Sequence, residues 1–283
     1  MGLGFQGDVV DYYQRYRRGY PAPVIDALAA AVNLDGSSLV LDLGCGTGQL
    51  TLPMASRARA VIGMDPEPEM LARARQVSRD RAVRNVTWIL GADVDVPAVG
   101  ATLGRDAISA VTIGQALHWM NAETVFKDLV PHLHPGGSVA VVTNGSPAWL
   151  HDSTWSQALR GFLEDWLGEP VSYACGTDAA SQQRYAGLLR EADLIVSETN
   201  VHYVDTIDFE HLIGSLYSAF SIDQLPAPDK REYFAAKLRA ALPATETFDE
   251  PVSVKILIGT KYQARRHYRD ETGRLRTPTS HRP

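Results

Sequence analysis

The sequence contains little cysteine and no long apolar run. Cys45 and Cys175 are its two cysteines among 283 residues, and they form no CxxC pair. A disulfide framework and a structural zinc site are therefore disfavoured. No stretch reaches the roughly 18 consecutive apolar residues of a membrane-spanning helix, and residues 1–7 lack a basic segment leading into an apolar core. We therefore expect a cytoplasmic protein.

Basic charge is scarce in residues 151–250. The formal net charge is −6, and residues 151–250 carry 17 acidic side chains against 7 basic ones, whereas residues 251–283 carry 2 against 8. An acidic block of this kind repels phosphate backbones and attracts cations. It argues against a nucleic-acid partner for most of the chain. Such a block suits either a solvated surface or a face that binds cations.

The first half alternates short apolar runs with amphipathic segments. This pattern is typical of βαβ units with right-handed crossovers and a mostly parallel sheet. Strands are predicted at residues 39–44, 60–64, 86–90, 107–113 and 138–143, the last after a turn at 135–137. Helices are predicted at residues 23–32, 50–56, 68–81 and 122–133.

The second half is mainly helical. Helices are predicted at residues 153–167, 182–192, 209–220 and 229–242, with strands at 195–206 and 252–262. Because the last strand is apolar, we place it in the first-half sheet. The fold prediction is an α/β, doubly wound, seven-stranded and mostly parallel sheet, with a mainly helical cap inserted between strands five and seven.

This prediction divides the chain into four parts. Residues 1–36 form N-terminal helices, residues 37–145 and 251–263 form the core, and residues 146–250 form an acidic, mostly helical cap that includes strand six. Residues 264–283 are rich in arginine, lack apolar periodicity and are predicted to form a disordered basic tail.

Three glycines mark a ligand loop after the first strand. Gly44, Gly46 and Gly48 allow positive φ angles and close approach of a ligand to the backbone. A dinucleotide fingerprint requires a third glycine at position 49, where the chain has Gln49, so a pyrophosphate cofactor is disfavoured. Asp42, inside the strand, either accepts hydrogen bonds from the loop or faces a cationic group of the ligand.

The segment Asp42-Leu43-Gly44-Cys45-Gly46-Thr47-Gly48-Gln49-Leu50 resembles the first motif of class I S-adenosylmethionine-dependent methyltransferases. Three later segments resemble the same family in order: residues 63–65 (Gly-Met-Asp), residues 91–93 (Gly-Ala-Asp) and residues 105–108 (Arg-Asp-Ala-Ile). The resemblance implies a Rossmann-like fold. It also implies the cofactor S-adenosyl-L-methionine, with S-adenosyl-L-homocysteine as product, and no metal.

Two more segments resemble small-molecule methyltransferases of the type 11 kind. Residues 13–21 resemble YxxYRPGYP, with Arg18 where proline is usual, and residues 115–120 resemble QAxHWF, with Met120 replacing the aromatic residue. The resemblance implies that Tyr13 and Arg17 close over the methionyl carboxylate of the cofactor. The alternative is a surface helix whose aromatic side chains dock on the core.

The same resemblance assigns roles to individual residues. Asp65 is expected to receive the ribose hydroxyls, and Asp93 to accept the adenine amino group. The expected cofactor contacts are Tyr13, Arg17, Asp42, Gly44, Cys45, Gly46, Gly48, Asp65, Pro66, Met70, Asp93, Val94 and Gln115. The expected acceptor contacts are His118, Trp119, Trp149, Asp152 and Tyr173. His118 is the candidate catalytic base, and a buried structural histidine is the alternative.

The acceptor remains open between two chemistries. The acidic block, with Asp152, Glu164, Asp165, Glu169 and Asp178 as candidates, suits N-methylation of a cationic amino sugar or aminoglycoside in natural-product or antibiotic biosynthesis. The alternative is O-methylation of a hydroxylated polyketide, macrolide or deoxysugar, with His118 as base. We expect a small-molecule acceptor and neither nucleic acid nor a membrane as partner, and leave a homodimer open.

Two further functions are weighed against these. A protein that binds the cofactor without transferring its methyl group is disfavoured by the intact glycine loop. RNA methylation guided by the basic tail is disfavoured by the acidic cap and by Ile113-Gly114-Gln115-Ala116, which stands where an N/D-PP-Y/F tetrapeptide would be needed. His132 and His134 lie two positions apart and do not share a helix face, so no metal site is expected.

Overall fold

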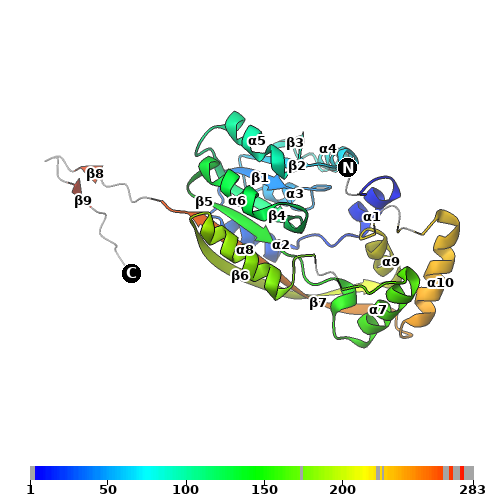
Figure 1. The fold of residues 1–283 in the computed structure, drawn as a ribbon. Coiled ribbons are helices and arrows are strands. Elements are labelled where there is room, and N and C mark those ends of the chain that lie inside the picture. Colours follow the sequence, from blue (N-terminus) through cyan, green and yellow to red (C-terminus); the bar gives the residue numbers. More distant parts are fainter. Residues whose placement is uncertain are drawn as a thin grey trace.

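A computed structural model describes residues 4–172, 175–220, 224, 226–263, 268–269 and 275–276. Its central feature is a seven-stranded sheet with the order β3-β2-β1-β4-β5-β7-β6 (Figure 1). The strands are β1 (Leu39–Leu43), β2 (Ala60–Asp65), β3 (Val86–Leu90), β4 (Ile108–Gly114), β5 (Leu133–Val142), β6 (Leu194–Asp208) and β7 (Thr247–Lys261). The doubly wound sheet predicted from the alternating pattern is confirmed.

The last long strand enters the middle of the sheet. Strands β1 to β5 pair in parallel, whereas β7 runs antiparallel to both β5 and β6. Residues 256–260 of β7 pair with β5, and the whole of β7 pairs with β6 over 15 residues. The apolar sequence of β7 is expected for a strand covered on both faces. The placement of the last strand in the first-half sheet is thus confirmed.

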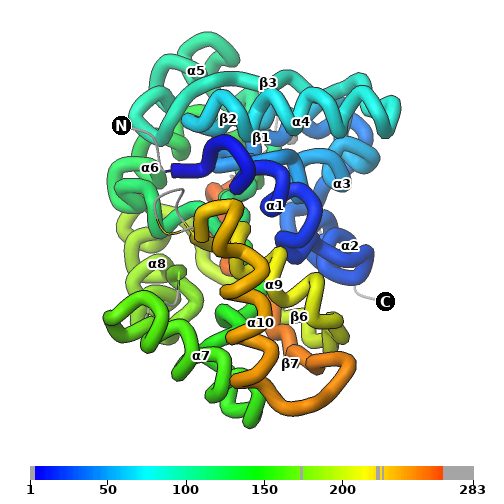
Figure 2. The backbone as a smooth tube through the Cα atoms, turned by 90° about the vertical axis from the view of Figure 1, so that its right-hand side faces the viewer, coloured from blue at the N-terminus to red at the C-terminus, as the bar shows by residue number. Residues whose placement is uncertain are grey.

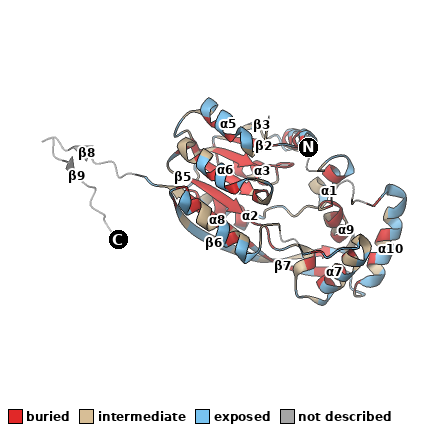
Figure 3. Ribbon diagram, in the orientation of Figure 1, coloured by how far each residue is buried: buried red, intermediate tan, exposed pale blue. Residues whose placement is uncertain are grey.

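Helices cover both faces of the sheet. The helices are α1 (Asp8–Tyr16), α2 (Ala22–Ala31), α3 (Thr51–Ala55), α4 (Pro68–Asp80), α5 (Val96–Leu103), α6 (Ala122–Leu129), α7 (Thr154–Leu167), α8 (Ala179–Glu191), α9 (Phe209–Tyr217) and α10 (Arg231–Ala241). α2 and α3 pack in one apolar cluster, and α5, α6 and α8 pack in a second one across the sheet. Figure 3 shows the strands buried between helices whose outer faces are exposed.

The far halves of β6 and β7 carry a third apolar cluster. From here on, the word cap means this cluster and its helices, and no longer the whole of residues 146–250. The cluster contains side chains of α7, α9 and α10, and its centre is Phe234, which is fully buried among Trp166, Tyr217 and Phe220. The helix α8 packs against β6, β7 and α6 instead. Residues 146–250 therefore contribute both to the cap and to the cover of the sheet.

Three local predictions differ from the structure. The helix predicted to end at residue 133 ends at Leu129, because Pro131 lacks the N–H that a continuing helix requires, and a 3₁₀ turn follows (Val130–His132). The turn predicted at 135–137 lies inside β5, where the register against β4 shifts between Ile108 and Ala110. The helix α5 was not predicted, because it spans eight residues and includes Pro97 and Gly100.

Most of the predicted tail lies outside the described residues. Within it the structure describes β8 (Tyr268–Arg269) and β9 (Leu275–Arg276), which pair with each other in a separate two-stranded ladder. No helix in the described part of the chain has the length and apolar character needed to cross a bilayer.

Candidate cofactor and acceptor site

A cavity of about 200 Å³ lies where the core, the N-terminal segment and the cap meet. Its wall includes residues of the glycine loop, the segment after β4, the segment after β5 and the cap helix α9. This is the carboxyl-end side of β1 and β4, where ligands of open α/β sheets bind. Figure 2 shows α1 between the core and α9, and α1 contacts both α4 and α9.

The glycine loop leaves β1 with three left-handed residues. The φ angles of Gly44, Gly46 and Gly48 are +67°, +54° and +87°, a region that glycine enters without strain. A Cβ atom on Gly44 would lie 2.4 Å from the Cβ of Ala116, and one on Gly46 would lie 3.6 Å from the Tyr13 ring. The loop backbone therefore packs directly against the segment after β4 and against α1.

Asp42 is buried beneath this loop and lines the cavity. Its carboxylate accepts hydrogen bonds from the hydroxyls of Thr51 and Thr112, the latter at 2.7 Å. Burial raises the pKa of Asp42 to about 6, although the two hydroxyls oppose the shift. Of the two roles predicted for Asp42, acceptance of loop N–H groups has no hydrogen bond among the described residues to support it, whereas its position on the cavity wall fits a charged ligand.

Asp65 holds the glycine loop instead. Its two carboxylate oxygens accept the backbone N–H groups of Gly46 and Glu67 at 2.8 and 2.9 Å. Burial raises the pKa of Asp65 despite these bonds. The carboxylate is buried and is absent from the cavity wall. The structure thus shows a loop-bracing role for Asp65, and its predicted contact with ribose hydroxyls stays a prediction.

The expected adenine contacts lie along the ends of β2 and β3. Asp93 accepts the backbone N–H of Asn121 at 2.9 Å, and Asn121 caps α6. Pro66 is exposed, and Val94 is 78% exposed, whereas Met70 is buried on the cavity wall. Pro66 and Val94 present apolar surface to solvent on this side of the sheet.

The N-terminal segment closes the cavity above the loop. The guanidinium of Arg17 lies 5.6 Å from the centre of the Tyr13 ring, and both side chains line the cavity. Burial raises the pKa of the Tyr13 hydroxyl, and Arg17 opposes that rise. Gln49 donates its side-chain N–H to the carbonyls of Arg17 and Tyr13 at 3.0 and 3.3 Å. The glutamine that replaces the third glycine thus ties α1 to the loop.

The segment after β4 supplies three further residues of the wall. Gln115 has a φ of +50°, and its Oε1 is buried without a hydrogen-bond partner among the described residues. His118 faces the same cavity, and burial together with the charge of Arg17 lowers its pKa to about 4. Its ring lies 5.1 Å from that of Trp119, which is 53% exposed and also lines the cavity.

The predicted acceptor residues of the cap separate in the structure. Trp149 is buried and lines the cavity. Asp152 is exposed and lies outside the cavity wall, as do Glu164, Asp165, Glu169 and Asp178. Glu164 accepts the backbone N–H of Val171, and Asp178 caps α8. Tyr173 lies outside the described residues. None of the five acidic residues proposed from the sequence as acceptor contacts therefore lines the cavity.

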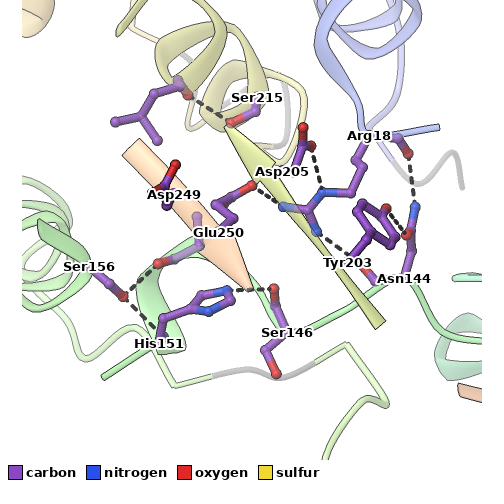
Figure 4. Close-up of polar contacts among 12 residues, drawn as sticks. Arg18, Asn144, Ser146, His151, Ser156, Tyr203, Asp205, Ser215, Asp249 and Glu250 are labelled. Atoms are coloured by element: carbon purple, nitrogen blue, oxygen red, sulfur yellow. Dashed lines mark hydrogen bonds and ion pairs between the residues drawn. The ribbon is translucent and has the colours of Figure 1, made fainter. Parts of the chain in front are cut away.

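On the acceptor side of the cavity, the carboxylates of the wall come from β6 and β7 instead. Asp205 and Glu250 line the cavity together with Arg18 and Asn144 (Figure 4). The Arg18 guanidinium contacts both carboxylates, and its third nitrogen donates to the Asn144 carbonyl at 3.0 Å. The sequence patterns did not predict this cluster of Arg18, Asp205 and Glu250. The one sign of it in the sequence is Arg18, at a position where the motif has proline.

Comparisons with known proteins match this core. Residues 40–137 match the model of a family described as a methyltransferase domain. An uncharacterized methyltransferase of Mycobacterium tuberculosis H37Rv is 35% identical over 144 residues, which are 51% of this chain and 53% of that protein. A trans-aconitate 2-methyltransferase of Azoarcus sp. BH72 is 37% identical over 117 residues, which are 40% of this chain and 42% of that protein.

The family match spans β1 to β4 and the start of β5, which is the part of the chain that carries the glycine loop. The chain spans about half the length of the curated relatives it matches. Solved structures show the same fold at low identity. The YcgJ protein of Bacillus subtilis has a TM-score of 0.53, 14% identity, and coverage of 85% of this chain and 98% of that chain. A precorrin 8w decarboxylase of Methanobacterium thermoautotrophicum has a TM-score of 0.51, 15% identity, and coverage of 86% and 93%.

The cavity fits the methionyl end of S-adenosyl-L-methionine, the cofactor that the sequence resemblance implies. The cofactor's methionyl end carries a carboxylate and an ammonium. Arg17 forms no ion pair with any carboxylate of the described residues, so its guanidinium is available to an anion. The unpartnered Gln115 Oε1 and the Asp42 carboxylate are acceptors for an ammonium. The cavity wall thus offers a cation to the methionyl carboxylate and hydrogen-bond acceptors to the methionyl ammonium.

Proposed function

We propose that this protein transfers the methyl group of S-adenosyl-L-methionine to a small molecule bound in the cavity. The observation that carries the proposal is the continuity of one cavity from the glycine loop and Arg17 to His118 and the cap. A cofactor on the loop and an acceptor under the cap would share that space. Among its walls, α1 and the cap exclude water, which favours the reaction.

In this proposal the bound cofactor would supply a methyl group attached to a sulfonium sulfur. Transfer of that methyl group would leave the cofactor as a neutral thioether. Arg17 holds the methionyl carboxylate, and Gln115 and Asp42 orient the ammonium. The aromatic rings of Trp119 and Trp149 position an acceptor against the loop. The task of the protein is then alignment of two reactants at a fixed distance.

The charges in the cavity favour an uncharged, hydroxylated acceptor. Apart from Asp42, which is assigned to the cofactor, the carboxylates among the described residues of the wall are Asp205 and Glu250, and both contact Arg18. A cationic acceptor would therefore have to compete with an arginine of the chain itself. We infer that the reaction is O-methylation of a hydroxylated polyketide, macrolide or deoxysugar.

His118 is the proposed proton acceptor for this reaction. Because burial and Arg17 lower its pKa to about 4, the imidazole is neutral near pH 7 and has a free lone pair. As the acceptor oxygen forms its bond to the methyl carbon and the carbon–sulfur bond breaks, the hydroxyl proton passes to the imidazole. A low pKa is sufficient here, because a hydroxyl that is gaining a methyl group is far more acidic than a free alcohol.

N-methylation of a cationic amino sugar or aminoglycoside is the second candidate. It is favoured by the presence of Asp205 and Glu250 in the cavity wall, since carboxylates bind an ammonium well. It requires Arg18 to leave them. The name of the Azoarcus relative adds a third class, a carboxylate acceptor such as trans-aconitate, for which Arg17 and Arg18 would be the partners.

The test is transfer of labelled methyl from S-adenosyl-L-methionine across aminoglycosides, neutral hydroxylated polyketides and trans-aconitate, with the attachment atom determined by mass spectrometry. Turnover confined to the hydroxylated compounds supports the proposal. Turnover confined to the amines or to trans-aconitate overturns the acceptor class. The variant His118→Ala is compared with His134→Ala, whose imidazole is exposed and outside the cavity. Loss of turnover in the first variant alone, with cofactor affinity unchanged, supports the base.

A further inference from the structure

Two like charges face each other across the antiparallel pair of β6 and β7. Asp205 of β6 and Glu250 of β7 are register partners, and like charges in directly opposite positions destabilise a strand pair. The Glu250 side chain is 4% exposed and that of Asp205 is 35% exposed. Both line the cavity of the proposed methyl transfer. A countercharge is therefore required at this position.

Arg18 supplies that countercharge from the other end of the chain. Its Nε lies 3.3 Å from the Asp205 carboxylate, and another nitrogen contacts Glu250, as Figure 4 shows. The planar guanidinium matches two carboxylates in a way that a lysine ammonium does not. With one cation on two carboxylates, this wall retains one negative charge instead of two.

The backbone around Arg18 fixes the guanidinium in this place. The side chain of Asn144 donates to the carbonyls of Arg18 and Gly19 at 3.0 Å each, and the Asn144 carbonyl accepts from the guanidinium. A Cβ on Gly145 would lie 3.2 Å from a guanidinium nitrogen of Arg18, so the glycine leaves room for it. Arg18 is thus held at both its main chain and its side chain.

We propose that Arg18 determines the charge selectivity of the cavity by occupying the two carboxylates that would otherwise bind a cationic acceptor. This inference rests on the proposed function, because it concerns the acceptor part of the same cavity. Arg18 is 19% exposed and lines the cavity, so an acceptor that reaches this wall meets a guanidinium already paired. An uncharged acceptor can use the remaining hydrogen-bonding groups without displacing the guanidinium.

The first experiment measures cation binding without any methyl transfer. Thermal unfolding of the wild type, Arg18→Met and the triple variant Arg18→Met/Asp205→Asn/Glu250→Gln is followed against ethylguanidinium chloride, with sodium chloride at equal ionic strength as reference. We expect a saturable rise in Tm for Arg18→Met and none for the other two proteins. An equal response of wild type and Arg18→Met overturns the proposal, as does an equal response of Arg18→Met and the triple variant.

A variant that does not fold without the probe still gives an answer. If Arg18→Met is unfolded in sodium chloride, its soluble, cofactor-binding fraction is measured after refolding with and without ethylguanidinium. Recovery by the probe supports the proposal, and equal yields overturn it. Arg18→Lys serves as the matched charge control: because its ammonium stays near the carboxylates, we expect a weaker response to the probe than that of Arg18→Met.

The second experiment measures selectivity. For Arg18→Met we expect the ratio of kcat/KM for amine acceptors to kcat/KM for hydroxylated acceptors to rise at least about tenfold over wild type, which corresponds to about 1.4 kcal/mol. An unchanged ratio, with both rates reduced alike, shows that Arg18 has a structural role alone. If no compound is methylated by any variant, the proposed function fails, while the probe experiment still decides whether Arg18 occupies a position that accepts cations.

Discussion

At the scale of single residues, His118 makes the proposed reaction testable by pH. Because its pKa is lowered to about 4, the imidazole stays neutral through the usual pH range and becomes protonated only as the pH falls through about 4. With S-adenosyl-L-methionine saturating, so that its ammonium keeps Asp42 ionised, we expect kcat/KM for the acceptor to be flat from about pH 5 to 8 and to fall below that range. An inflection near 6.5, the ordinary histidine value, would contradict the assignment.

The same shift predicts a pH dependence of stability. An unfolded His118 binds a proton near pH 6.5, whereas the folded one does so only near 4, so the unfolded state gains protons first as the pH falls. The free energy of unfolding should therefore decrease between about pH 6.5 and 4 because of this residue. His118→Asn should show a shallower decrease in Tm over that window. His134→Asn, at an exposed position outside the cavity wall, is the control.

Arg17 is expected to contribute to cofactor affinity through its charge. Because the guanidinium has no ion pair among the described residues, Arg17→Gln should weaken binding of S-adenosyl-L-homocysteine by about 10- to 100-fold, the range for a charge-assisted hydrogen bond. Calorimetric titration measures the change. Arg15→Gln, whose guanidinium is exposed and lies 3.8 Å from Glu210, should change the affinity little. Equal losses of affinity in both variants would show that the net positive charge of the N-terminal segment, and not a contact of Arg17, is responsible for the effect.

Gly44 is expected to tolerate no side chain. Its φ is +67°, and an added Cβ would approach the Ala116 Cβ to 2.4 Å, so Gly44→Ala combines a strained backbone with a steric clash. We expect a loss of about 2–4 kcal/mol in the free energy of unfolding. Gly36→Ala, where nothing lies within 4 Å and φ is not positive, is the matched control. Denaturant titration of both variants checks the difference, and an unaffected Gly44→Ala would contradict the packing of the loop.

At the scale of elements, α1 connects two parts of the molecule. Asp11 forms an ion pair with Arg73 of α4, and Tyr12 packs edge-on against Tyr217 of α9 at 5.0 Å. On the same helix, Tyr16 donates its hydroxyl to Glu210 of α9 at 2.8 Å. A helix held from both sides in this way has a position that depends on the cap as well as on the core. The cap should therefore influence cofactor binding without touching the cofactor.

This connection gives a prediction for Tyr12. The side chain lies outside the cavity wall, so Tyr12→Ala removes one contact between α1 and α9 and leaves the cavity lining in place. The Tyr16 contacts with α9 remain in this variant, so we expect a loosened helix, with faster amide hydrogen exchange in α1 and a severalfold weaker affinity for S-adenosyl-L-homocysteine. Tyr233→Ala, a 57% exposed tyrosine of α10, is the control. Unchanged affinity with faster exchange would show that α1 does not contribute to binding.

At the scale of the whole molecule, local signals explain what was predictable. The glycine loop and the alternating elements are encoded within a few residues, so the sheet followed from the sequence and is confirmed. The resemblance to methyltransferases is supported by the domain match over residues 40–137, and the ligand-binding side of the sheet stays a prediction. The position of His118 in the cavity also followed from its place after β4. Each of these features can be predicted from residues that are close in the sequence, together with the general rules of one fold.

Contacts between distant segments were not predictable in the same way. The acidic block predicted that carboxylates of the cap would line the acceptor pocket. Which carboxylates do so depends on how α7, α9 and α10 pack against β6 and β7, and no local sequence pattern specifies that packing. Asp205 and Glu250 become neighbours because β6 and β7 pair in one register. Arg18 meets them from positions 187 and 232 residues away. A change of two positions in that register would have placed other side chains on the wall.

Removal of the C-terminal segment tests how far the described fold depends on it. The strands β8 and β9 pair with each other and belong to no other sheet. A chain ending at Gln263 should therefore keep its Tm and its affinity for S-adenosyl-L-homocysteine. A decrease in either value would show that the basic segment contributes to the core or to the site, and a decrease in turnover alone would point to a role with the acceptor.

The insertion of β7 between β5 and β6 has a consequence for synthesis on the ribosome. The glycine loop and Arg18 emerge early, but Glu250 and the strand that completes the sheet emerge more than 200 residues later. Until then β5 presents a free edge, and Arg18 lacks one of its two carboxylates. A nascent chain can thus form the parallel strands while the cavity is still open, and the acceptor wall is assembled only near the end of translation.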